Sequence, residues 1–331
     1  GYGIGYRFSE TKVGSTNGNF TGLGADSCQR AVLVDQAQAP GLLITNGEFV
    51  GRWGSTDSVG LEIGAAVKGK VSLVNCAFWG PLDRCVWMRG AAGQFTASAC
   101  NFVNWDIGHH DSPAIQIDAG KAIVQGSTFG EDHLHVRVGK DATSAIITAN
   151  QATGGFRIDN QAGKRTQSAL NEADSIEWTD PARSHYRIAM GESGSGHYLL
   201  GWHGSEVGAR WSLPSSSLLL PVIPGKAYTI TMKLLAPPQS LSTDAGLYLD
   251  GKQIAPLTSS DTLTATLPAT TKDQLRLELR SQGWVPMKFD TTSKDPRTLG
   301  VQVSSVEVRA ADAGERVFDA NKGEWLQAGA K

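Results

Sequence analysis

Along the first half of the chain, short runs of alternating apolar and polar residues recur and predict β-strands. A phenylalanine behind a polar or small-residue lead-in marks each recurrence, and the five positions are Phe20, Phe49, Phe78, Phe102 and Phe129. Successive phenylalanines are 29, 29, 24 and 27 residues apart. A repeat of this length with variable spacing is typical of a solenoid, in which loops change in length while the strands stay stacked.

Aliphatic runs stand at similar places in each repeat. They lie before the phenylalanine at residues 42–44, 71–74 and 122–124, and after it at residues 61–63, 86–88, 115–117 and 134–138. Period-two alternation turns the aliphatic side chains inward, and stacked coils then bury a column that one coil alone cannot bury. We therefore predict a right-handed parallel β-helix over residues 1–160. A β-sandwich is the alternative, but unrelated hairpins do not readily repeat the whole asparagine–phenylalanine unit.

The asparagines of this repeat have a structural interpretation. Residues of this type commonly occupy tight, partly left-handed turns between strands, so they need carry no chemistry.

Beyond residue 160 the repeat stops and a different pattern begins. Residues 161–184 are predicted to be a linker, and residues 185–313 read as short alternating strands with glycine and proline turns. Asp250-Gly251 is a strong hairpin signal within this region. We predict an antiparallel β-sandwich, jelly-roll-like, followed by a C-terminal tail at residues 314–331. The fold class is thus all-β.

Composition narrows the class of partner. With 331 residues, two domains are expected, and a formal net charge of −2 gives no bias toward nucleic acid or anionic lipid. A neutral partner fits better, and a homo-oligomer stays open. No apolar run is long enough to span a membrane, and residues 1–6 lack the features of a signal peptide.

Four cysteines match neither a disulfide framework nor zinc-ligand spacing. Cys76 and Cys100 each stand two residues before a repeat phenylalanine, so we expect them on neighbouring coils. Buried free thiols are the preferred interpretation there, with a disulfide as the alternative.

Several segments carry a family resemblance. GYGIGY at residues 1–6, GADSC at 24–28 and APGLLITNGEF at 39–49 resemble the middle of bacterial proteins in the pectate-lyase-like, polygalacturonase-related β-helix superfamily. The resemblance covers roughly the first 160 residues and implies that further coils precede them. The second half, with Trp202, Glu206, Trp211 and the segments 283–286 and 295–300, is similar to an accessory β-sandwich of bacterial surface-polysaccharide proteins.

Together these resemblances imply a secreted or cell-surface bacterial protein that handles polysaccharide. They do not fix a reaction, because the superfamily includes hydrolases, lyases, epimerases, phage tailspikes and adhesins. The motifs of the hydrolase families have only partial counterparts in this chain, at Gly108-His109-His110 and at Arg137-Val138 with Lys140. The family's catalytic roles are therefore not carried over.

Candidate chemistry gathers in the loops that follow each repeat phenylalanine. Coils spaced by about 4.8 Å would align these loops along one groove. The predicted catalytic residues are the carboxylates Asp106, Asp111 and Asp132, with His110 and His133 assisting proton transfer. The predicted substrate-binding residues are Trp53, Trp79, Asp83, Arg84, Trp105, His135 and Arg137, since tryptophan offers a flat apolar face to sugar rings.

Two alternatives compete for these loops. A lyase would need a base and a cation from Arg89, His135, Arg137 and Lys140, but Arg89, Asp118, Arg137 and Asp159 would equally form an outward ion-pair ladder. A metal site at His109, His110 and Asp111 is disfavoured, because adjacent histidines on an extended chain point opposite ways. No metal and no cofactor are predicted.

In the second domain, Trp202, Glu206, Arg210, Trp211 and Trp284 would form a carbohydrate-binding face. Core tryptophans and a buried arginine–glutamate pair explain the same residues equally well. The leading hypothesis is a glycoside hydrolase, with a polysaccharide lyase second. The alternatives are a non-catalytic fibre, tailspike or adhesin-like module that binds glycan, and a purely structural spacer.

Overall fold

The computed structural model describes residues 2–10, 17–37, 39–171, 176, 178–259 and 261–327. The chain forms two compact units, Gly1–Ala173 and Asp174–Lys331. None of the helices in the described residues is long and apolar enough to cross a membrane.

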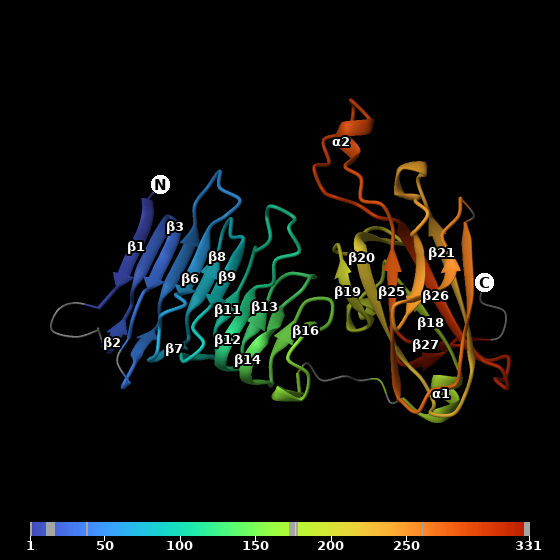
Figure 1. Cartoon of the computed structure of the whole chain (residues 1–331), viewed down its shortest axis with the longest axis horizontal. Helices are drawn as coiled ribbons and strands as arrows, with labels where there is room; N and C mark the ends of the chain where they lie inside the picture. Colours follow the sequence, from blue (N-terminus) through green and yellow to red (C-terminus); the bar gives the residue numbers. More distant parts are fainter. Residues whose placement is uncertain are drawn as a thin grey trace. The chain divides into compact units, whose positions relative to one another are not determined.

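The first unit, drawn from blue to green in Figure 1, is a parallel β-solenoid. Its strand pairings form three ladders. The first ladder contains β1 (Tyr2–Phe8), β3 (Gly24–Val34), β6 (Val59–Ile63), β9 (Arg84–Met88), β12 (Ile115–Gln125), β14 (Val136–Thr148) and β16 (Ile158–Asn160). The second contains β2 (Gly18–Thr21), β4 (Leu42–Thr45), β7 (Lys70–Val74), β10 (Gln94–Ser98), the later parts of β12 and β14, and β17 (Thr166–Ala169). The third contains the start of β3, β5 (Glu48–Gly51), β8 (Ala77–Trp79), β11 (Asn101–Phe102), β13 (Thr128–Phe129) and β15 (Gln151–Ala152). The predicted parallel β-helix is confirmed.

The register of these ladders aligns the apolar residues of the repeat. Phe49, Phe78, Phe102 and Phe129 are paired position by position along the third ladder. Their ring centroids lie 5.1, 5.5 and 4.9 Å apart in sequence order. All four rings are buried, so the phenylalanine repeat is a continuous aromatic stack in the core.

Phe20 does not belong to this stack, contrary to the sequence prediction. It lies in the second ladder, where it pairs with Ile44, and Ala25 takes the position opposite Phe49. The reason is the corner between ladders, which follows Phe20 at Gly22 (φ 71°) but precedes Phe49 at Asn46 (φ 53°). The similar residues before Phe20 and Phe49 therefore precede strands of two different ladders.

That corner has a left-handed backbone in every coil. The residues are Gly22, Asn46, Asn75, Ala99, Gly126, Ala149 and Leu170. The predicted turn role of the asparagines is confirmed at two corners, where Asn75 also donates its side-chain amide to Asn46 Oδ1 at 2.8 Å. Cys76 and Cys100 follow the corners of neighbouring coils as predicted, and both are buried free thiols.

The second unit is built from antiparallel strands around one apolar core. One sheet contains β18 (His185–Ala189), β21 (Tyr228–Leu235), β24 (Thr262–Leu267), β26 (Gln302–Ala310), β27 (Phe318–Asp319) and β28 (Glu324–Trp325). The other contains β19 (Leu199–Trp202), β22 (Gly246–Leu249), β23 (Lys252–Pro256) and β25 (Gln274–Arg280), and β20 (Arg210–Pro221) pairs in both. Short helices are α1 (Asp180–Ser184), α2 (Pro286–Phe289), η2 (Ser195–Tyr198) and η3 (Pro238–Ser240), while η1 (Gly163–Arg165) belongs to the solenoid. The antiparallel prediction holds, except that β27 pairs parallel with β18.

Two predicted boundaries need correction. Within the expected linker at 161–184, β17 pairs with β14 and continues the solenoid, although its outer face is polar. Within the expected tail at 314–331, β27 pairs with β18 and buries Phe318 in the second core. Both strands are too short to show an alternating pattern, so the sequence did not reveal them.

Candidate functional site

The loops that lead from the third ladder back to the first carry the most concentrated chemistry. The main chain extends the coil register into these loops, because Asp83 N–H donates to Ser58 O at 2.7 Å and Asp106 N–H donates to Asp83 O at 3.1 Å. Asp83 and Asp106 are therefore stacked on neighbouring coils by backbone hydrogen bonds.

The loop that contains Asp106 folds tightly around its carboxyl group. Asp106, His109 and Asp111 have φ angles of 56°, 55° and 59°, a left-handed conformation that aspartate and histidine tolerate better than most residues. His110 N–H donates to Asp106 Oδ1 at 2.8 Å. The His110 ring passes close over Gly108, where an added Cβ would lie 2.5 Å from its Cε1 atom.

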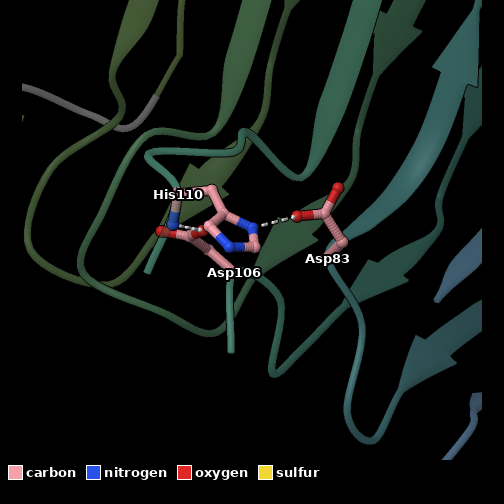
Figure 2. A group of neighbouring side chains, drawn as sticks. All are labelled: Asp83, Asp106 and His110. Carbon is pink, nitrogen blue, oxygen red and sulfur yellow. Dashed lines mark hydrogen bonds and ion pairs between the residues drawn. The ribbon is translucent and has the colours of Figure 1, made fainter. Parts of the chain in front are cut away.

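These turns bring three side chains together, as Figure 2 shows. One donor atom from each of Asp83, Asp106 and His110 lies within 4.8 Å of the other two. The closest pair is His110 Nδ1 and Asp83 Oδ1, 3.2 Å apart. Asp83 and Asp106 are buried, whereas 57% of the His110 side chain is exposed, so the cluster is reached from the His110 side.

The two carboxyl groups have different surroundings. Asp83 accepts hydrogen bonds from Arg84 at Oδ2 (2.8 Å) and from Ser112 at Oδ1 (2.8 Å). Burial raises the pKa of Asp106 to about 7, although backbone N–H groups of Ser112 and His110 oppose the rise. Near neutral pH, Asp106 is thus partly protonated beside a carboxylate that an arginine neutralises.

Asp111 and Arg137 lie beside this cluster but form a separate ion pair. Arg137 bonds Asp111 Oδ2 and Asp159 Oδ2, each at 3.0 Å. Burial raises the pKa of Asp111 to about 6, and the guanidinium of Arg137 opposes this shift. Arg137, in β14, therefore joins the loop that contains Asp111 to β16 through two carboxylates.

The expected outward ladder forms only in part. Arg137 and Asp159 are paired in register, as the ladder requires. Arg89, however, bonds Glu62 at 3.0 Å, and Asp118 accepts the indole N–H of Trp87 at 2.7 Å. The uncertainty in coil length had left this register open.

Two predicted substrate-binding residues face the interior instead. Trp105 is 1% exposed and donates its indole N–H to Leu134 O at 3.1 Å. His135 is fully buried and stacks on Phe156 with ring centroids 5.3 Å apart. Neither residue can present a face to a sugar, and the lyase hypothesis loses His135 as its base.

Asp132 and His133, predicted to be catalytic, have structural partners. Asp132 Oδ1 accepts a 2.5 Å hydrogen bond from Arg157, whose side chain is only 3% exposed. The His133 ring lies 5.0 Å from the Trp105 ring. Asp132 thus balances a buried charge that would be costly alone.

Trp53 and Trp79 are exposed, whereas Trp87, within β9, is partly buried. Trp53 is 62% and Trp79 41% exposed, and the Trp79 indole N–H donates to Glu48 Oε1 at 3.0 Å. Trp87 has guanidinium groups of Arg84 and Arg89 over its ring, 4.7 and 4.8 Å from the centroid.

In the second unit the predicted carbohydrate-binding face divides. Trp202 and Arg210 are buried, so their assignment to a binding face is wrong. Arg210 donates to the carbonyls of Met190 and His203, while Glu206 bonds Arg297 at 2.8 Å, so the expected arginine–glutamate pair is also replaced. Trp211 and Trp284 are partly exposed, with ring centroids 5.7 Å apart.

Asp83 was predicted to bind substrate, without a connection to Asp106. Ser112 and the space that Gly108 leaves for His110 were missed as well. The signal was present in the repeat length, because Asp83 and His110 are 27 residues apart, within the spacing of the phenylalanine repeat.

No protein-family model and no curated protein sequence matches the chain. Among solved structures, it is similar to the enzymatically active domain of tailspike protein 4 from bacteriophage CBA120, with 9% identity and a TM-score of 0.28 over 88% of this chain and 54% of that one. It is also similar to a tailspike protein of Acinetobacter baumannii phage AM24, with 10% identity and a TM-score of 0.29 over 94% of this chain and 62% of that one. The chain thus spans less than two thirds of either protein.

Proposed function

We propose that this protein binds a polysaccharide along the solenoid loops and hydrolyses a glycosidic bond at Asp83 and Asp106. The observation that carries the proposal is the contrast between these adjacent carboxyl groups. Glycoside hydrolysis requires one protonated carboxyl group and one carboxylate on either side of the bond. Asp106, with its pKa raised to about 7, supplies the proton, and Asp83, held by Arg84, supplies the carboxylate.

The spacing of the pair favours retention of configuration. One oxygen of each carboxyl group lies within 4.8 Å of the other. Retaining enzymes place their carboxyl groups about 5 Å apart, whereas inverting enzymes leave room for a water molecule at about 6.5–9.5 Å. In this mechanism Asp83 attacks the anomeric carbon while Asp106 protonates the leaving oxygen. Asp106 then removes a proton from the water that releases the sugar.

Exposed aromatic residues support glycan binding on the same set of loops. Trp79 is the last residue of β8, directly before the loop that leads to Asp83, and Trp53 stands in the corresponding loop of the preceding coil. Their exposed rings would stack on sugar rings. A non-catalytic glycan-binding module is the second candidate, because the tryptophans alone suffice for binding. A secreted or cell-surface location is part of both proposals.

The test is incubation of the protein with a panel of neutral and acidic polysaccharides, following new reducing ends and the absorbance of unsaturated uronates. Reducing ends without unsaturated products, lost in Asp106→Asn, would support hydrolysis. Unsaturated products would establish a lyase instead. Retention on one glycan without any product would leave the binding module.

A further inference from the structure

The Asp83, Asp106 and His110 cluster has a geometry that hydrolysis alone does not require. His110 Nδ1 and Asp83 Oδ1 are 3.2 Å apart, and a carboxylate oxygen of Asp106 completes a group within 4.8 Å. Two donors bound to one ion at about 2.0–2.2 Å lie at most about 4.4 Å apart, and closer when they are adjacent ligands. The closest pair therefore already has the spacing of neighbouring ligands.

The other contacts of these residues hold both carboxyl groups of the cluster in place. Arg84 bonds Asp83 through Oδ2, the oxygen that does not face His110. Ser112 donates to Oδ1, the same oxygen that lies 3.2 Å from His110 Nδ1, and so fixes its direction. The backbone N–H of His110 holds Asp106 Oδ1. Such outer contacts orient ligands before an ion arrives.

Charge around the cluster favours a cation. Asp83, Asp106, Asp111 and Asp159 contribute carboxyl groups, whereas Arg84 and Arg137 contribute the guanidinium groups that bond them. When all four carboxyl groups are ionised, acidic groups outnumber basic ones in this set by two. Asp106 is only 6% exposed, and its bonded partners are backbone N–H groups.

We propose that Asp83, Asp106 and His110 bind one divalent transition-metal ion, with Zn²⁺ the best match. A mixed imidazole and carboxylate set suits zinc and its neighbours, whereas calcium and magnesium prefer oxygen ligands alone. Three protein ligands leave the exposed side beside His110 open for water. This reverses the sequence expectation that no metal binds, and it pairs His110 with Asp83 and Asp106 instead of with His109.

The inference also has a consequence that rests on the proposed function. An ion bound to Asp106 displaces the proton that hydrolysis requires, so Zn²⁺ should inhibit cleavage. Binding itself is measured without any substrate, so failure of the metal site and failure of the hydrolase proposal are separate outcomes.

The experiment is calorimetric titration of the chelator-treated full chain with Zn²⁺, with Ca²⁺ in parallel. We expect one Zn²⁺ per chain and at least tenfold weaker binding of Ca²⁺. His110→Asn should weaken Zn²⁺ binding at least tenfold. His109→Asn is the matched control, because it makes the same change one residue away at a left-handed position that asparagine tolerates. It should bind within twofold of the unmodified protein.

Equal Zn²⁺ affinity in His110→Asn and the unmodified protein would overturn the proposal, as would equal losses in both histidine variants. Thermal melting checks that each variant is folded. If His110→Asn does not fold, Co²⁺ added to the unmodified protein provides a second measurement. A visible absorption band that Zn²⁺ abolishes at one equivalent would support the site, and its absence would overturn it.

Discussion

Asp106 is stacked on Asp83 by the main chain, its N–H donating to the carbonyl of Asp83 at 3.1 Å. The side chains of these two residues therefore meet because their coils are in register, and the site is a product of the solenoid itself. Changes to exposed side chains of these loops should act mainly on the site, whereas changes to buried side chains should also act on stability. The predictions below separate these two classes.

Asp106→Asn should change how stability depends on pH. The folded pKa of Asp106 is raised from 3.8 to about 7, so the folded chain holds this proton more tightly than the unfolded chain does. The contribution of this proton to the free energy of unfolding is complete below pH 3.8 and is lost as pH rises toward 7. Between pH 5 and pH 8 the variant should gain about 2–3 kcal/mol relative to the unmodified protein, since each pKa unit corresponds to about 1.4 kcal/mol. Urea unfolding at both pH values measures this. A constant difference between the two proteins would contradict it.

The rate of hydrolysis should also depend on the ionisation of Asp106. Because Asp106 must be protonated to act as the acid, kcat/KM should fall as pH rises through about 7. Asp106→Asn should lower kcat about 100-fold to 10,000-fold, as expected for loss of a general acid. Rate profiles across pH on the substrate found in the panel give the check. A rate that climbs through pH 7 would assign the acid elsewhere.

Gly108→Ala should displace the His110 ring without unfolding the chain. The new Cβ would lie 2.5 Å from the ring, which is the mobile end of a side chain, and Gly108 does not have a left-handed backbone that would strain alanine. Zn²⁺ affinity should fall at least fivefold while the melting temperature changes little. Gly24→Ala is the control, because nothing lies within 4 Å of its added Cβ. Unchanged Zn²⁺ binding in Gly108→Ala would count against His110 as a ligand.

Phe102→Ala should cost about 3–5 kcal/mol in the free energy of unfolding, because it removes the middle of a buried aromatic stack. Phe20→Ala makes the same change outside the stack, at a partly exposed position, and should cost clearly less. Urea denaturation of both variants provides the comparison. Equal losses would mean that the stack has no special weight in the core.

Trp79→Ala should affect glycan binding, whereas Trp105→Ala should affect stability. Trp79 is 41% exposed, so its loss should weaken glycan retention with little change in melting temperature. Trp105 is 1% exposed, so its loss should lower the melting temperature strongly. Affinity electrophoresis in the retained glycan and thermal melting test the pair. Undiminished retention in Trp79→Ala would remove that face from the binding site.

The fold was largely predictable because its signal repeats. Leu61, Val86 and Ile115 align in register, as the alternation of their strands indicated. Phe20 was assigned to the wrong ladder because the polar residues before it resemble those before the other phenylalanines. The ladder depends instead on whether the residue precedes or follows the left-handed corner of its coil. Residues 166–169 and 318–319 were missed because two to four residues are too few for periodicity.

The site was only partly predictable for a different reason. The loops that carry Asp106 and His110 were found by composition, and composition does not tell exposed from buried side chains. Trp105 and His135 fill the space inside loops that were expected to face solvent. Joining Asp83 to His110 required the alignment of two coils across 27 residues, and unequal coil lengths obscured that alignment.

The left-handed corners recur at intervals of 21 to 29 residues, yet the strands on either side keep their register. Differences in length between coils therefore fall in the loops, such as the one that contains His110, and not in the strands. The exposed part of one loop can therefore be changed while the strands of the next coil keep their places, provided that buried contacts such as Trp105 to Leu134 are kept. New specificity should be obtained by exchanging residues 107–110, which keeps the buried Trp105 and the Asp111–Arg137 ion pair in place.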